Sequence, residues 1–200
     1  MSAPLRPDLA IIADHIPAGA SVLDVGCGDG ALLAALRDKG CDGALLAALR
    51  DKGYDARGME LDPRNVAECV GHGLSVIQGD ADTDLAFYPD KSLDYAVLSQ
   101  TLQTTKRPDL VLDELLRVGR RAFKSIPNFA HSRSRPPPPF PPVAWYETPN
   151  IHHLTIADFR DHLAARGIRV EGAWFLKGDR QTGAAAANFR AEHAVFLLAR

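Results

Sequence analysis

The sequence predicts an α/β fold in which a doubly wound, mostly parallel sheet of seven strands has helices on both faces and an antiparallel last strand. Three observations support this prediction. Short runs rich in valine, leucine and isoleucine alternate with segments of helical periodicity. A glycine-rich turn joins the first of these runs directly to a helix. Near the end of the chain, two apolar runs follow each other without a helix between them, which indicates a late strand pair.

The first half of the chain alternates helix and strand from its start. A helix is expected at roughly Pro7 to Ile16, because proline suits a first turn and Leu9, Ile12 and Ala13 continue an apolar stripe. Asp62 is expected to cap a later helix that has Pro63 at its first position. The expected elements after the first helix are a strand at 21–25 (SVLDV), a helix at 31–40 that closes on Gly40, a strand at 54–61 (YDARGMEL), a helix from Pro63 through Cys69, and a strand at 74–78 (LSVIQ).

The second half continues the alternation and then changes in texture. Thr155, with Asp158 three residues later, resembles a capping box at the start of a helix that ends at Gly167. The proline-rich segment 132–143 is expected to be a surface linker, and 178–187 a loop of small residues. The expected elements are strands at 93–99 (LDYAVLS) and 121–127 (RAFKSIP), an amphipathic helix at 107–119, a helix at 155–167, and strands at 168–176 and 192–199.

Composition limits the functions that this chain can have. Its 200 residues, 46% of them hydrophobic, suffice for a single domain with a sizeable core, expected to span 1–200. A net charge of -2 and a pI near 6.4 provide no electrostatic footprint for nucleic acid or an anionic membrane. The three cysteines lack metal-ligand spacing, and no apolar run is long enough to span a bilayer. We therefore expect a cytoplasmic protein without a metal site that binds small molecules or proteins.

The glycine-rich turn reads Asp24-Val25-Gly26-Cys27-Gly28-Asp29-Gly30. Glycines permit a tight strand-to-helix turn and let a ligand approach the backbone amides at the start of the helix. A relaxed dinucleotide fingerprint also fits the turn, so a nicotinamide-dependent enzyme remains an alternative. Asp24 disfavours that alternative, because its carboxylate would repel a pyrophosphate but suits a ligand with an ammonium and a sulfonium. The pattern D-x-G-x-G-x-G resembles the first motif of class I methyltransferases that bind S-adenosylmethionine (SAM).

Further candidates follow the predicted strands, at the edge of the sheet where such a ligand would lie. Glu60 ends the second strand and is placed to accept hydrogen bonds from both hydroxyls of a ribose. Asp80, after the third strand, is a candidate for the adenine amino group, although strand-end aspartates often only cap turns. The complete predicted set for SAM, or for its product S-adenosylhomocysteine, is Asp24, Gly26, Cys27, Gly28, Gly30, Glu60, Leu61, Asp80, Ala81, Ser99 and Gln100.

Beyond these motifs, the chain resembles the MetW family of methionine biosynthesis proteins. The most specific segments are LSQTLQ, PNFAH and TPNIH, together with VLDVGCGDGALL and the terminal NFRAEHAVFLL. The resemblance covers nearly the whole chain and implies a class I methyltransferase fold, cytoplasmic work in methionine synthesis, and a homoserine O-acyltransferase as partner. It leaves two functions open, namely a SAM-dependent small-molecule methyltransferase and a non-catalytic subunit that activates the acyltransferase. The family pattern has one helix after the glycine turn, and its linker is longer and less proline-rich.

This chain instead writes that helix twice, since residues 29–40 reappear as 42–53. A single continuous helix would turn the second leucine set away from the first and overshoot the next strand. We therefore expect one copy, the first, to occupy the helix position beside the sheet. The extra copy carries Leu45, Leu46 and Leu49, which could be covered by a second subunit or a swapped helix, or could pack on the same molecule.

The catalytic residues cannot be assigned from the sequence. Methyl transfer depends on alignment more than on a strong acid or base, so the lack of an obvious nucleophile does not exclude it. Cys27 is expected to be a loop filler, because no basic residue neighbours it in sequence. The polar residues that could face the methyl group are Gln100, Thr101, Gln103, Asn128, His131, Tyr146, His152 and His153.

Overall fold

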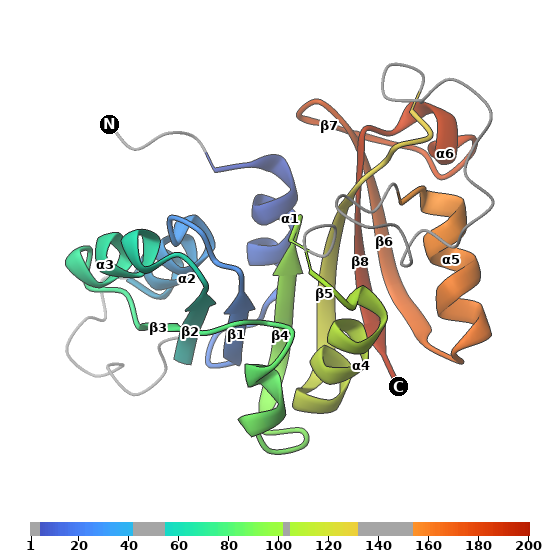
Figure 1. Ribbon diagram of the computed structural model, residues 1–200. Helices are drawn as coiled ribbons and strands as arrows, with labels where there is room; N and C mark the ends of the chain where they lie inside the picture. Colours follow the sequence, from blue (N-terminus) through green and yellow to red (C-terminus); the bar gives the residue numbers. More distant parts are fainter. Residues whose placement is uncertain (1–4, 42–54, 102–104, 132–153) are drawn as a thin grey trace.

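The structure, a computed structural model, describes residues 5–41, 55–101, 105–131 and 154–200 (Figure 1). Its centre is an eight-stranded sheet with the strand order β3-β2-β1-β4-β5-β8-β6-β7. The strands are β1 (Ser21–Val25), β2 (Asp55–Glu60), β3 (Val76–Gln78), β4 (Leu93–Ser99), β5 (Gly119–Pro127), β6 (Arg169–Lys177), β7 (Arg180–Thr182) and β8 (His193–Ala199). The helices are α1 (Pro7–His15), α2 (Ala31–Cys41), α3 (Pro63–Gly71), α4 (Pro108–Val118), α5 (Ile156–Ala165) and α6 (Ala187–Arg190), with a 3₁₀ turn η1 (Asp84–Phe87).

The doubly wound sheet predicted from the sequence is confirmed. Strands β1 to β5 pair in parallel, and β8 lies antiparallel between β5 and β6. All seven predicted strands are present, and the structure adds an eighth, β7, inside the segment predicted to be a loop. Gly178 makes this strand possible, because its φ of 58° permits the tight turn that folds β7 back onto the end of β6.

Local signals account for the helix ends. The Asp62 side chain accepts a hydrogen bond from the backbone N–H of Arg64, and Pro63 occupies the first turn, as predicted. Thr155 Oγ1 accepts a hydrogen bond from the N–H of Asp158 and caps α5. Helix α2 runs one residue past the predicted stop at Gly40, a difference within the usual uncertainty of helix ends.

Two hydrophobic cores cover the two faces of the sheet. Alternate residues of the strands point to opposite faces, so Val22 and Val97 join one core whereas Leu23 and Leu98 join the other. Helices α1 and α2 complete the first core through side chains that include Leu9, Ile12, Leu32 and Leu36. Helices α4 and α5 complete the second through Val111, Leu112, Leu115, Leu116, Phe159 and Leu163.

The first copy of the duplicated segment forms α2 and packs on the sheet. Leu32, Leu33 and Leu36 are buried, and Leu33 contributes to a small cluster with Cys27 and Cys69. The expected choice of the first copy therefore agrees with the structure. The second copy lies outside the described residues.

This assignment predicts the effect of shortening one leucine. Leu36 is fully buried, so Leu36→Ala should lower the free energy of unfolding by roughly 2–5 kcal/mol through lost apolar contact and a residual cavity. Urea unfolding followed by circular dichroism measures this loss. Leu49→Ala makes the same change in the second copy. A neutral Leu36→Ala together with a strongly destabilising Leu49→Ala would mean that the second copy occupies the helix position.

Strand order also locates the site. The chain reverses its winding direction between β1 and β4, which lie side by side in the middle of the sheet. In open α/β sheets, ligands bind outside the carboxyl ends of the strands at such a switch point.

Candidate functional site

A cavity of about 340 Å³ opens at the carboxyl ends of the strands around this switch point. Segments that follow four neighbouring strands line it, and such a volume suits a nucleoside-sized ligand. Its lining residues are Gly26 after β1; Met59, Glu60 and Leu61 at the end of β2; Gly79, Asp80, Ala81 and Asp82 after β3; and Thr101, Thr105 and Lys106 after β4. Five predicted ligand-binding residues therefore come together here: Gly26, Glu60, Leu61, Asp80 and Ala81.

Glu60 is held in one orientation by two backbone amides. Its Oε2 accepts a hydrogen bond from the N–H of Gly28 at 2.8 Å, and its Oε1 accepts one from the N–H of Asp62 at 3.0 Å. A carboxylate has about four lone-pair sites, so each oxygen retains the capacity to accept another bond. Glu60 is therefore pre-oriented for a pair of neighbouring hydroxyl donors.

The backbone amides of the glycine turn do not form the ligand cradle expected from the sequence. The N–H groups of Gly26 and Cys27 both donate to the carbonyl oxygen of Met59, at 2.7 and 3.2 Å. The N–H of Gly28 donates to Glu60, and that of Gly30 donates to the carbonyl oxygen of Cys27. That expectation is therefore wrong for these four amides, because protein acceptors already satisfy them. An incoming pyrophosphate would meet the Glu60 carboxylate instead of a free donor.

The three glycines of the turn are required for different structural reasons. A Cβ on Gly26 would lie 2.7 Å from Thr101 Cγ2, and one on Gly30 would lie 2.5 Å from Leu74 Cδ1. Close packing within the protein therefore requires these two glycines. Gly28 has a φ of +57°, yet nothing lies within 4 Å of the position its Cβ would occupy. Gly28 is not among the residues that line the cavity, but the space above it is open.

Asp24 lies at the start of this turn and is unusual because its carboxyl group is buried. The side chain is buried, and its Oδ1 has no hydrogen-bond partner among the described residues. Burial raises the pKa of Asp24 to about 7, Arg6 opposes this rise, and the neighbouring carboxylates of Glu60, Asp8 and Asp29 add to it. An unpaired buried carboxyl group of this kind is stabilised by a cationic ligand.

The aspartates after β3 combine structural and ligand-facing positions. Asp80 lines the cavity, and its Oδ1 also accepts a hydrogen bond from the N–H of Asp82, so the turn-capping interpretation holds as well. Asp82, which the sequence reasoning missed, accepts hydrogen bonds from the N–H groups of Lys106 and Arg107 at 2.9 and 3.0 Å. It thereby ties this wall of the cavity to the start of α4. The sequence signal that could have identified Asp82 is its place in the segment GDAD, two residues after Asp80.

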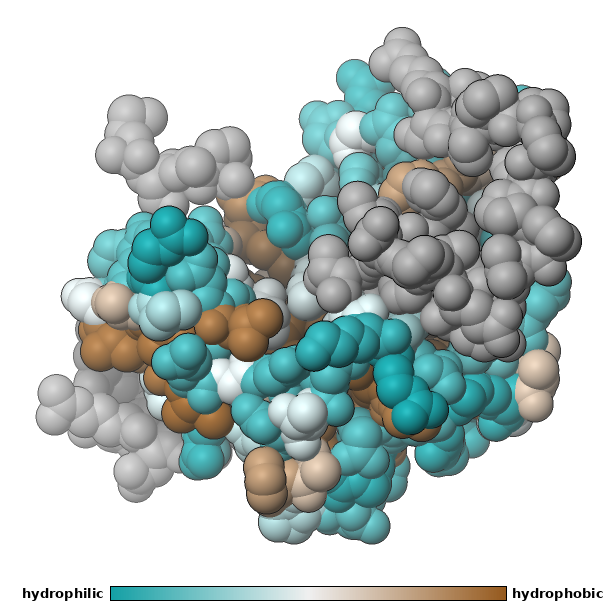
Figure 2. Space-filling view, in the orientation of Figure 1, coloured by the Kyte–Doolittle hydropathy of each residue, from teal (hydrophilic) through white to brown (hydrophobic). Residues whose placement is uncertain are grey.

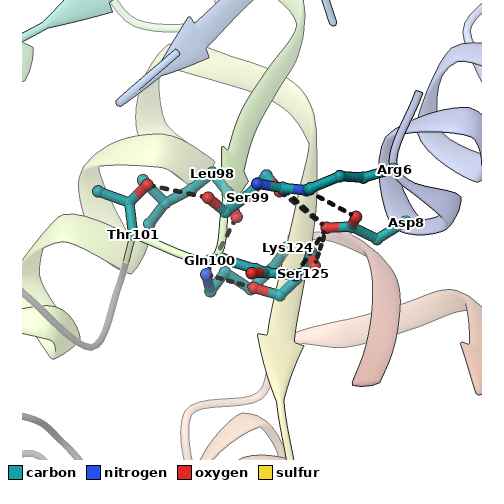
Figure 3. Close-up of polar contacts among 8 residues, drawn as sticks. All are labelled: Arg6, Asp8, Leu98, Ser99, Gln100, Thr101, Lys124 and Ser125. Carbon is teal, nitrogen blue, oxygen red and sulfur yellow. Dashed lines mark hydrogen bonds and ion pairs between the residues drawn. The ribbon is translucent and has the colours of Figure 1, made fainter. Parts of the chain in front are cut away.

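Ser99 and Gln100 lie beside the cavity but are not among its lining residues. Both side chains donate hydrogen bonds to Oδ2 of Asp8 from α1, at 2.9 and 3.3 Å (Figure 3). Thr101, the next residue, lines the cavity. The polar cluster around Asp8 was missed from the sequence because a first-turn aspartate is usually solvated.

The remaining candidates have structural surroundings. Cys27 is buried against Leu33 and Cys69, and burial, reinforced by the charge of Asp24, raises the pKa of its thiol, so its expected role as a filler fits. Asn128 uses both amide hydrogens on the carbonyls of Asn188 and Ala191, and its Oδ1 accepts from two backbone N–H groups. His131 is buried. The candidates Gln103, Tyr146, His152 and His153 lie outside the described residues.

Comparison with known proteins agrees with this architecture. Residues 6–198 match the model of the family described as "Methionine biosynthesis protein MetW". The chain belongs to this family. A curated MetW-containing relative, the bifunctional methionine biosynthesis protein MetXA/MetW of Rhodopirellula baltica, is 36% identical over 186 residues, which are 88% of this chain and 29% of that protein. This MetW-family chain therefore spans less than a third of that relative's length.

Solved structures of other proteins share the fold of this MetW-family chain. A SAM-dependent methyltransferase from Archaeoglobus fulgidus is similar with a TM-score of 0.63 and 19% identity, covering 96% of this chain and 92% of that one. The [4+2]-cyclase SpnF is similar with a TM-score of 0.64 and 17% identity, covering 95% and 78%. The fold therefore accompanies more than one chemistry. Among the described helices, none combines the length and apolarity needed to cross a membrane.

Proposed function

We propose that the cavity at the ends of β1 to β4 binds SAM. The observation that carries this proposal is the charge of the site: Glu60, Asp80 and Asp82 line the cavity against Lys106, the one cation among its described lining residues. In addition, Oδ1 of the buried Asp24 side chain, two residues before Gly26, has no hydrogen-bond partner in the described part of the chain. This arrangement favours a ligand with a positive charge and hydroxyl donors over a diphosphate. When bound, SAM would supply an electrophilic methyl group on a sulfonium.

Residues of the cavity wall and of the glycine turn have distinct parts in this proposal. Glu60 accepts hydrogen bonds from the ribose hydroxyls with the lone pairs that Gly28 and Asp62 leave free. Asp80 and Ala81 lie on the adenine side, and Leu61 offers an apolar surface beside the ring. Asp24 stabilises the ammonium group. The open space at Gly28 receives the body of the ligand.

Titration calorimetry with three ligands tests the proposal. SAM and S-adenosylhomocysteine are expected to bind, whereas NAD⁺ is not, because its pyrophosphate meets Glu60 instead of a free amide. Glu60→Gln should weaken both nucleosides, since a neutral amide is a poorer acceptor for two hydroxyls. Binding of NAD⁺ without binding of SAM would overturn the assignment.

We infer a small-molecule methyltransferase as the first candidate activity. The chain's contribution is to hold the methyl group in line with an acceptor in a site from which water is excluded. Incubation with methyl-labelled SAM and an extract of small metabolites, followed by product separation, measures transfer. Label that stays entirely on SAM would favour the second candidate below.

The second candidate is an accessory subunit that binds and activates a homoserine O-acyltransferase. The relative that joins MetXA and MetW in one chain supports it. Apolar side chains exposed at the open β3 edge of the sheet, where Figure 2 shows brown surface, add to this support. Leu61 is 62% exposed, Ile77 53% and Phe87 84%.

Co-purification with the acyltransferase, and its turnover with and without this chain, tests the second candidate. A complex and an increased turnover are expected from an accessory subunit, whereas an enzyme acting alone shows neither. Phe87→Asp asks whether the β3 edge makes the contact. Phe189→Asp, at an exposed phenylalanine of α6, is the matched control.

A further inference from the structure

The carboxylate of Asp8 is a buried hub that joins three elements. It lies in the first turn of α1 and is only 2% exposed. Its oxygens accept hydrogen bonds from Arg6 at 3.0 and 3.1 Å and from Ser125 Oγ at 2.6 Å, in addition to those from Ser99 and Gln100 (Figure 3). The hub thus connects α1 with the ends of β4 and β5.

A buried lysine lies beside this hub (Figure 3). Lys124 on β5 is fully buried, and its Nζ donates to the carbonyl oxygens of Leu98 and Ser125 at 3.0 and 2.7 Å. Burial lowers the pKa of Lys124 well below its usual value, and the charge of Asp8 opposes that effect. Burial alone would raise the pKa of Asp8. The hydrogen bonds from Arg6, Ser125 and Ser99 and the charge of Arg6 outweigh this effect, so the pKa lies below its usual value. The hub is therefore ionised at neutral pH.

The hub holds a turn with unusual backbone geometry. Gln100 has a φ of 53°, in the left-handed region that residues other than glycine rarely adopt. Its N–H donates to the carbonyl oxygen of Ser125, and its side chain donates to Asp8. Strain at a single residue persists only where its surroundings compensate for it, and here the contacts to Asp8 and Ser125 do so.

This turn places Thr101 in the cavity wall. Thr101 Oγ1 donates to the carbonyl oxygen of Ser99 at 2.9 Å, and its side chain packs so closely over Gly26 that a Cβ there would lie 2.7 Å away. A chain of contacts therefore runs from α1 through Asp8, Gln100 and Thr101 to the glycine turn.

We propose that Asp8 is a positioning residue for the ligand cavity, acting through the left-handed turn at Gln100 that sets Thr101 over Gly26. The inference rests on the proposed SAM site and adds a residue that does not line the cavity. According to this inference, tight ligand binding requires the first turn of α1 to be packed against the sheet.

Two readouts test the inference. Asp8→Asn should weaken SAM binding about tenfold, the change expected when charge-assisted hydrogen bonds are lost. In the ligand-free protein, the amide NMR signals of Gly26 and Thr101 should shift in Asp8→Asn. Asp14→Asn removes a carboxylate from an exposed position at the other end of the same helix, and should change neither readout.

A second-site variant separates positioning from general stability. Gln100→Gly removes the backbone strain, since glycine adopts a φ of 53° freely. Added to Asp8→Asn, it should recover part of the lost affinity, which a merely structural defect would not allow. If Asp8→Asn does not fold, Ser125→Ala removes one donor from the hub, keeps its charge, and should produce smaller changes in the same direction.

The outcomes distinguish this inference from the proposed function. Unchanged affinity and unchanged amide signals in Asp8→Asn would overturn the positioning role while leaving the SAM site intact. A wild-type chain that binds no SAM would overturn the proposed function. In that case the amide signals of Gly26 and Thr101 alone still decide whether Asp8 shapes the cavity wall.

Discussion

Replacement of Gly28 by valine is expected to abolish SAM binding. The side chain would enter the open space above the turn, where no atom other than those of the adjoining residues lies within 4 Å of its Cβ. A valine there occupies volume that the ligand needs, so the dissociation constant should rise at least about 100-fold. Titration calorimetry with SAM measures the loss.

A matched variant separates ligand exclusion from backbone strain. Valine at a φ of +57° costs roughly 1–3 kcal/mol of folding free energy wherever it occurs. Gly73, two residues after α3, has a φ of +74° and the same empty surroundings, but its N–H donates to the carbonyl oxygen of Val70, whereas that of Gly28 donates to Glu60 in the cavity wall. Gly73→Val should therefore lose similar stability and keep its affinity. Equal affinity in Gly28→Val and wild type would place the ligand elsewhere.

Much of the fold could be predicted because its signals are local. The buried strand Ser21–Val25 and the Asp62-Pro63 helix start follow from short patterns that tertiary contacts reinforce. Strand β7 was not predictable, because three polar residues pair only where Gly178 folds them back onto β6. No apolar alternation marks such a segment.

The site was predictable in its positions more than in its contacts. Glu60 and Asp80 could be chosen because strand ends meet at one edge of a parallel sheet. Which donors those carboxylates bind depends on side-chain geometry. The Gly28 amide, expected to face a ligand, instead donates its hydrogen bond to Glu60. The Asp8 cluster joins residues 91 and 117 positions apart, a separation that no local pattern reports.

The buried carboxyl of Asp24 should make SAM binding depend on pH. With a pKa of about 7 in the ligand-free protein, Asp24 is about one-tenth ionised at pH 6 and nine-tenths at pH 8. A cationic ligand selects the ionised form, so affinity should rise from pH 6 to pH 8, by less than the roughly tenfold change in ionised Asp24 because the α-ammonium of SAM itself begins to lose its proton near pH 8. The other charges acting on this group are Arg6, which precedes α1, Asp8 of α1, Glu60 of β2 and Asp29 of the turn.

The raised pKa of Asp24 has the opposite effect on the stability of the ligand-free protein, which should fall as the pH rises. Because the folded-state pKa of Asp24 lies above the ordinary value of 3.8, its contribution to the free energy of unfolding is fully present below about pH 4. That contribution is lost as the pH rises through about 7. Asp24→Asn should therefore raise the melting temperature at pH 8, where the wild-type group is ionised and buried.

Asp24→Asn thus combines a stabilised fold with a weakened site. Its affinity for SAM should fall, and the rise in affinity between pH 6 and pH 8 should disappear, because no carboxyl remains to be ionised by the cation. Asp29→Asn, at an exposed carboxylate of the same turn, should retain the pH dependence. A pH dependence that persists in Asp24→Asn would show that another group is coupled to the ligand, and the electrostatic basis for a cationic ligand at this turn would fail.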